Sequence, residues 1–169
     1  LEDPAHPIGA PVNLAQWPRA ERWVVAPTAP ALHVVTVLGR LFMRYEVEPP
    51  FESLDAAIGS IVGEDPDALV LVEVHAEATS EKVAMVWQCH ERGAGHVVAV
   101  VGSHTHVQTS DARIVGGRLA ALTDLGMCGG RGGVIGFNTR ASLERLIGTR
   151  GTPLDVADED PVAEGCLIT

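Results

Sequence analysis

The stretch that decides the fold is Ala68-Leu-Val-Leu-Val-Glu-Val-His75, a nearly unbroken apolar run that ends in a histidine. Its short length and β-branched content predict a strand that is covered on both faces. Residues 97–101 form a second wholly apolar run, which leads into Gly-Ser-His-Thr-His at residues 102–106. Two predicted strands therefore each lead into histidine.

Helices are predicted on either side of the first run. Apolar residues three and four apart at Phe51, Leu54, Ile58 and Ile61 predict a helix over 51–62, and a similar pattern predicts another over 77–91. A strand over 32–37 and a hairpin of 114–115 with 119–123 add to the sheet. Strands that alternate with helices favour a layered α/β fold with a mixed sheet. We expect one domain over residues 1–169.

The two ends of the chain carry weaker signals. Six prolines between residues 1 and 31 predict an irregular segment that wraps over a core. Towards the other end we predict a glycine-rich loop at 126–133, a short helix at 141–147, an acidic solvated loop at 155–160 and a last strand at 166–168. Because the chain begins at Leu1 and stops after an apolar pair, we expect both ends to be cut.

The composition narrows the function. A formal net charge of -10 and a pI near 5.0 do not suit a protein that grips a nucleic-acid backbone. A phosphate ligand would then be small and would meet bound metal ions in place of a basic surface. The sequence has neither a membrane-length apolar run nor a Cys-x-x-Cys pair among its three cysteines, which favours a cytoplasmic protein.

His104 and His106 stand two residues apart, so in an extended conformation both side chains point to one side. Gly102 before them has no side chain to block close approach, and Ser103 and Thr105 are small enough to leave room for an ion. With His75 they make three imidazoles, a ligand type that suits Zn, Fe, Mn or Ni better than Ca or Mg. A histidine that is hydrogen-bonded for structural reasons is the commoner case at a strand end, so from spacing alone both interpretations stay open.

Other polar residues near these strands are weaker candidates. Glu77, Glu81 and Lys82 are interpreted as the charged start of a helix, where acidic residues favour the positive end of the helix dipole, although a role beside the site stays open. Asp124 is interpreted as a turn residue, with a ligand as the alternative. The glycines of 126–133 lack the Lys-Ser/Thr ending of a phosphate loop, which favours a flexible loop.

Four motifs in order are recognisable together: His75-Ala-Glu-Ala-Thr-Ser-Glu-Lys82, Val100-Val-Gly-Ser-His-Thr-His-Val-Gln-Thr109, Leu122-Thr-Asp-Leu-Gly-Met127 and Val134-Ile-Gly136. They resemble the YmdB-type bacterial metallophosphoesterases, relatives of the calcineurin-like phosphoesterases, most strongly over residues 39–136. The resemblance implies a four-layered α/β/β/α sandwich. This chain would be its C-terminal two-thirds, without the N-terminal strands.

The resemblance also implies an activity. Such proteins hydrolyse small phosphodiesters such as 2',3'-cyclic nucleotides with two divalent metal ions, iron or manganese before zinc. Carried over by motif, His75 and His104 bind one ion and His106 binds the other. The family's carboxylate ligands and its general acid belong to a segment absent from this sequence, so no catalytic residue is assigned here. Ser103 stands where threonine is usual.

We therefore expect the parent protein to be a phosphodiesterase that forms a homo-oligomer. The chain by itself is expected to bind metal weakly and to catalyse little, because three imidazoles without a bridging carboxylate would not hold two ions. Two other interpretations stay open. One is a non-catalytic metal-binding or oligomer-forming module, and the other is a hydrolase with a single ion on three histidines.

Overall fold

The main feature of this computed structural model is a six-stranded mixed sheet in the order β1-β2-β3-β4-β6-β5. The structure describes residues 9–14, 23–93, 95–148 and 153–169. Four neighbouring strands run parallel: β2 (Leu32–Leu38), β3 (Leu69–His75), β4 (Val97–Ser103) and β6 (Leu119–Leu122). Antiparallel strands β1 (Val24–Ala26) and β5 (Arg113–Val115) form the two edges. The predicted mixed α/β fold is confirmed.

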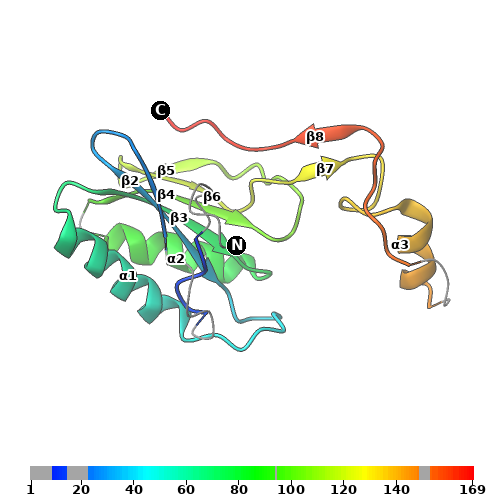
Figure 1. Cartoon of the computed structure of the whole chain (residues 1–169), viewed down its shortest axis with the longest axis horizontal. Helices are drawn as coiled ribbons and strands as arrows, with labels where there is room; N and C mark the ends of the chain where they lie inside the picture. Colours follow the sequence, from blue (N-terminus) through cyan, green and yellow to red (C-terminus); the bar gives the residue numbers. More distant parts are fainter. Residues whose placement is uncertain (1–8, 15–22, 94, 149–152) are drawn as a thin grey trace.

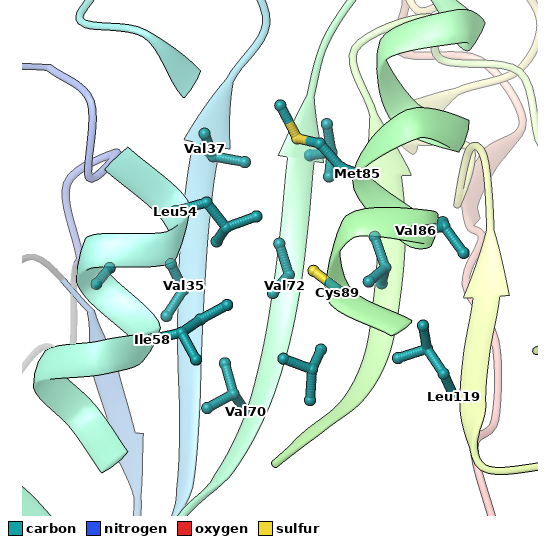
Figure 2. Close-up of a cluster of buried hydrophobic side chains, with 14 of the residues drawn as sticks. Val35, Val37, Leu54, Ile58, Val70, Val72, Met85, Val86, Cys89 and Leu119 are labelled. Carbon is teal, nitrogen blue, oxygen red and sulfur yellow. The ribbon is translucent and has the colours of Figure 1, made fainter. Parts of the chain in front are cut away.

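Two helices, α1 (Pro50–Glu64) and α2 (Thr79–Arg92), lie side by side on one face of this sheet (Figure 1). The helix α1 turns Leu54, Ile58 and Ile61 towards the strands, at the spacing that puts side chains on one helical face. Figure 2 shows Leu54 and Ile58 packed over Val35, Val70 and Val72, with α2 adding Met85 and Cys89. This core fastens both helices to the sheet.

The opposite face of the sheet differs from the prediction. Side chains along β3 alternate between fully buried (Val70, Val72 and Val74) and half-buried (Leu71 and Glu73). The strand is therefore not covered equally on both faces, because both helices lie on the same side. The four-layered sandwich stays a prediction, since the described residues supply one large sheet and one helical layer.

The C-terminal part extends away from the main sheet (Figure 1). It consists of β7 (Cys128–Gly130), α3 (Thr139–Leu146) and β8 (Pro161–Ala163), and β7 pairs with β8 in a sheet of two strands. We call residues 128–163 the C-terminal arm. The helix α3 buries only Ala141 and Ser142, so the arm has little apolar packing of its own.

Three sequence predictions about short strands were wrong. The glycine-rich loop contains β7, the last strand lies at 161–163 and not at 166–168, and β1 interrupts the segment predicted to be irregular. Each of these strands has three residues and exists because a partner strand pairs with it, which local propensity does not reveal. Residues 1–8 and 15–22 of the predicted irregular segment lie outside the described residues.

Within the described residues, the helices are too short or too polar to cross a bilayer.

Candidate functional site

The site is built at the edge of the sheet where the parallel strands end. His75 is the last residue of β3, Ser103 is the last residue of β4, and the register pairs the two directly. Asp124 follows β6, which runs parallel to β4, so it reaches the same edge. Ligands of open α/β sheets gather at this edge. The two strand ends that lead into histidine therefore lie side by side.

His75 and His104 form a close pair at this edge. His75 Nε2 lies 3.1 Å from His104 Nδ1, and the two rings meet edge to face with their centroids 4.8 Å apart. His75 Nδ1 lies 2.8 Å from Ser103 Oγ, which donates its hydrogen to Glu73. His104 Nε2 lies 3.3 Å from Glu77 Oε2. The histidine pair therefore sits between two carboxylates.

Burial also favours the neutral form of His75. It lowers the pKa of His75 below its ordinary value, and the nearby carboxylate of Glu73 only partly opposes this effect. A neutral imidazole has a free lone pair, which is the form that binds a metal ion. The electrostatic setting of His75 thus suits a ligand at neutral pH.

His106 does not contact this pair through a hydrogen bond. Its Nδ1 lies 2.8 Å from the carbonyl oxygen of Ile135, in the C-terminal arm. The predicted extended conformation was wrong, because β4 ends at Ser103 and the backbone turns with φ of 96° at His104 and 64° at His106. Such left-handed angles are uncommon for residues with a Cβ, and the two side chains meet different partners. The structure brings together two of the three predicted ligands.

A buried carboxylate holds the turn between these two histidines. Asp124 Oδ2 accepts hydrogen bonds from the Thr105 amide at 3.2 Å and the Thr105 hydroxyl at 2.7 Å. The same oxygen lies 2.9 Å from Lys82 Nζ, and the side chains of Asp124 and Lys82 are only 1% and 4% exposed, respectively. Burial alone would raise the pKa of Asp124, but the hydrogen bonds from Thr105 and Lys82 outweigh it and lower the pKa. Asp124 is therefore an anchor for the turn.

This anchor corrects two interpretations of the sequence. Lys82 is not part of a solvated helix start, because its ammonium group reaches Asp124 across the interior. Glu81 is buried as well and accepts hydrogen bonds from the backbone amides of Arg40 and Leu41, just after β2. The turn at Asp124 is confirmed, since its Oδ1 accepts from the amide of Gly126 at 2.9 Å. Its contacts with Lys82 and Thr105 were not predicted.

Gly102 allows a close approach, and the group that approaches it is the neighbouring backbone. A Cβ at this position would lie 1.8 Å from the carbonyl oxygen of Thr123, the residue after β6. Only glycine allows the backbones of these two neighbouring segments to come so close. The glycine is thus required by strand packing, and space for an ion does not explain it.

Glu73 is the residue that sequence reasoning missed. It is the one charged residue in the apolar strand β3 before its terminal histidine, and it stands two positions before His75, so both side chains leave the same face. Its Oε1 lies 3.8 Å from His75 Nδ1. A single carboxylate in an otherwise apolar run is the sequence signal that could have identified it.

The described residues do not assemble a complete metal centre. Among them there is no group of three or more His, Cys, Asp or Glu side chains placed to hold one ion. The pair of His75 and His104 supplies two converging nitrogens, while Glu73 and Glu77 are engaged on the far sides of the rings. The described residues therefore bring two histidine nitrogens together without a third ligand side chain.

The comparison with known families agrees with the motifs. The model of the YmdB-like protein family matches residues 3–169. The chain belongs to the YmdB-like family. This YmdB-like chain is 34% identical over 137 residues to the 2',3'-cyclic-nucleotide 2'-phosphodiesterase of Bacillus subtilis, which covers 81% of the chain and 49% of that protein. It is 37% identical over 117 residues to a putative phosphatase/phosphodiesterase of Mycoplasma genitalium, covering 67% and 38% respectively.

Solved structures share the fold of this YmdB-like chain. A hypothetical protein from Thermus thermophilus matches with a TM-score of 0.76 and 31% identity, over 93% of this chain and 65% of that one. A novel phosphatase from Mycoplasma pneumoniae matches with a TM-score of 0.74 and 29% identity, over 89% and 53% respectively. The chain spans about half, or less, of the length of the curated relatives it matches.

Proposed function

We propose that this chain is part of a metal-dependent hydrolase that cleaves small phosphodiesters, 2',3'-cyclic nucleotides among them. The observation that carries the proposal is the convergence of His75 Nε2 and His104 Nδ1, 3.1 Å apart at the carboxyl edge of the parallel strands. The name of the Bacillus subtilis relative supports the substrate class. The net charge of -10 agrees with a small phosphate ligand that meets metal ions in place of a basic surface.

The pair fits two neighbouring ligands of one ion. Imidazole nitrogens bind such metals at about 2.0–2.1 Å, so two of them on one ion at roughly a right angle are about 3 Å apart. The separation of 3.1 Å between His75 Nε2 and His104 Nδ1 matches this value. In the proposal these two residues hold one ion and His106 contributes to a second, after it releases the carbonyl of Ile135. Iron or manganese is proposed first and zinc next, since imidazole suits all three.

When bound, divalent ions supply positive charge opposite the phosphate oxygens and make water more acidic. The residues of this chain orient the ligands. Glu77 contacts His104, and Ser103 with Glu73 contacts His75, while Asp124 holds the backbone turn through Thr105. Further ligands are needed beyond those that the described residues bring together, so the chain alone is expected to bind metal weakly and to catalyse little.

Metal binding is tested by titrating the purified chain with Mn²⁺ in a calorimeter, beside the variants His104→Ala and His96→Ala. His96 is the matched control, because it stands just before β4, at the end of the strand opposite to the site. Its Nδ1 is hydrogen-bonded to the carbonyl oxygen of Ala68. We expect weak binding by the parent chain and by His96→Ala, and none by His104→Ala. Equal binding by all three would refute the site, and two tightly held ions per chain would contradict the expected weakness.

Activity is tested on the protein as its gene encodes it, with any residues beyond the two ends included. Hydrolysis of a 2',3'-cyclic nucleotide is followed by chromatography in the presence of Mn²⁺ or Fe²⁺. The His104→Ala variant lacks a proposed metal ligand and should have a kcat/KM lower by roughly 100-fold or more. The His96→Ala variant should keep the parent rate. An inactive parent, or an active His104→Ala variant, rejects the proposed reaction.

A second candidate is a non-catalytic module that forms homo-oligomers. The observation in its favour is the exposed apolar surface of the C-terminal arm, where the residues are 76% exposed at Leu146, 73% at Ile147 and 68% at Val156. Large apolar side chains that gather on a surface favour association. Sedimentation of the parent chain and of Leu146→Glu distinguishes the two candidate functions. The module is supported if the parent chain is a dimer, Leu146→Glu is a monomer, and the protein as its gene encodes it hydrolyses no cyclic nucleotide.

A further inference from the structure

We propose that Glu73, acting through Ser103, and Glu77 are positioning residues that set the tautomers of His75 and His104, so that both imidazoles turn an unprotonated nitrogen towards the same cation. The inference rests on the proposed function and deepens it. It assigns a role to a carboxylate inside a buried strand and to a serine that the motif of three histidines leaves without one.

The argument for His75 follows from counting hydrogens. An ionised carboxylate only accepts hydrogen bonds, so the single hydroxyl hydrogen of Ser103 is directed at Glu73. The Ser103 oxygen can then only accept from His75 Nδ1, which lies 2.8 Å away. His75 therefore carries its hydrogen on Nδ1, and its Nε2 keeps a free lone pair.

The sheet makes this chain of contacts unavoidable. Glu73 and His75 lie on one face of β3 because side chains alternate along a strand. The parallel register sets Ser103 directly beside His75, at the ends of two strands whose inner neighbours are fully buried. The strand register thus brings the three side chains together, while the side chains of His75 and Glu73 remain 36% and 22% exposed.

His104 follows the same logic from the other side. Its Nε2 lies 3.3 Å from Glu77 Oε2, and a carboxylate at this distance favours a hydrogen on Nε2. Its Nδ1 is left with the lone pair, and this atom faces His75 Nε2 at 3.1 Å. The Glu77 side chain is 49% exposed, so its hold on His104 is weaker than that of Ser103 on His75.

Two lone pairs that face each other at 3.1 Å repel, and a cation between them removes the repulsion. A histidine with a merely structural role would be satisfied in either tautomer, donating to Ser103 or to the neighbouring ring. Here the outer nitrogen of His75 is hydrogen-bonded to Ser103 and that of His104 faces the Glu77 carboxylate, which leaves the two inner nitrogens for a cation. Carboxylates behind metal-binding histidines act in this way and typically strengthen metal binding about 10- to 100-fold.

The test reads the tautomer directly, without any metal. Long-range proton–nitrogen NMR spectra of the ¹⁵N-histidine-labelled chain are recorded at pH 8, with His75→Ala to assign the signals. Ser103→Ala removes the acceptor, and Ser103→Thr is the matched control that keeps a hydroxyl. Glu73→Gln is a second variant, because an amide that donates to the serine oxygen frees the hydroxyl to turn towards His75. Circular dichroism melts check that each variant is folded.

We expect the Nδ1–H form of His75 in the parent chain and in Ser103→Thr. In Ser103→Ala and Glu73→Gln the signal should move towards the Nε2–H form, which can donate to His104. An Nε2–H form in the parent overturns the inference, as does an unchanged tautomer in both folded variants.

Mn²⁺ titration then separates this inference from the proposed function. We expect Ser103→Ala to weaken binding about 10- to 100-fold and Ser103→Thr to restore it. If the tautomers change as expected but the parent chain, and the protein as its gene encodes it, bind no metal, the proposed function fails and the positioning role stands. If binding is lost in His104→Ala but the tautomers never change, the reverse holds.

Discussion

His104 and His106 are two residues apart, yet His104 lies at the sheet edge and His106 contacts the C-terminal arm. By the sheet edge we mean His75 and His104 with their partners Glu73, Glu77 and Ser103. His104 contacts partners through both ring nitrogens, one at 3.1 Å and one at 3.3 Å. His106 makes one hydrogen bond, to a carbonyl of the arm. The difference teaches that the geometry of the first half of the site is imposed by a buried core, whereas that of the second half depends on a lightly packed segment.

The strongest way to break the sheet edge is to remove its buried anchor. Asp124→Ala leaves the ammonium of Lys82 without its carboxylate in a nearly water-free setting, and we expect a loss of about 3–5 kcal/mol in the free energy of unfolding. The control is Arg131→Ala in the arm, which removes an exposed ion pair with Asp160 and should cost about 0–1 kcal/mol. Urea unfolding measures both, and equal losses would contradict the comparison.

The packing beneath the two regions is compared by shortening one leucine in each. Leu54 is fully buried between α1 and the sheet, so Leu54→Ala should cost about 2–5 kcal/mol through lost burial and the cavity it leaves. Leu146 in α3 is 76% exposed, and Leu146→Ala should change the free energy of unfolding by about 0.5 kcal/mol or less. Thermal melts decide this, and a large loss at Leu146 would mean that the arm is packed against something.

Acid should weaken the sheet edge through Asp124. The folded state lowers the pKa of this carboxyl, whereas in the unfolded chain the pKa is about 3.9. As the pH falls below about 4, the unfolded state binds the proton before the folded state does. The contribution of Asp124 to the free energy of unfolding is therefore complete at higher pH and is lost progressively as the pH falls towards the pKa of the folded state. The Asp124→Asn variant has no carboxyl at this position and therefore lacks this contribution. Urea midpoints between pH 6 and 3 should therefore fall less steeply for Asp124→Asn, and parallel curves would disprove the effect.

The smallest effect is expected at His106. Its one hydrogen bond, to Ile135, lies in an exposed part of the molecule, so His106→Ala should lower the free energy of unfolding by no more than about 1 kcal/mol. Binding of the first Mn²⁺ should be affected less than by His104→Ala, since His106 hydrogen-bonds Ile135 and not the pair of His75 and His104. Calorimetry checks both, and a loss as large as that of His104→Ala would place His106 in the first ion's ligand set.

The sequence predicted the elements whose pattern is local. The long apolar runs became β3 and β4, and the helical spacing from Phe51 to Ile61 became α1, because burial on one face repeats with the period of the element. The strands β1, β7 and β8 escaped prediction, since each has three residues and depends on pairing. In the site, the strand ends at His75 and Ser103 were predictable from the same runs.

The motifs and their order in the sequence were enough to determine the family and to predict two buried strands that lead into histidine. Only the tertiary structure decided which partners these histidines meet. Ser103 reaches His75 across 28 residues, and Lys82 reaches Asp124 across 42. Such contacts depend on strand register and on how far a helix lies from its sheet. Likewise, His104 and His106 adopt left-handed backbone angles, and no local pattern of residue types specifies those angles.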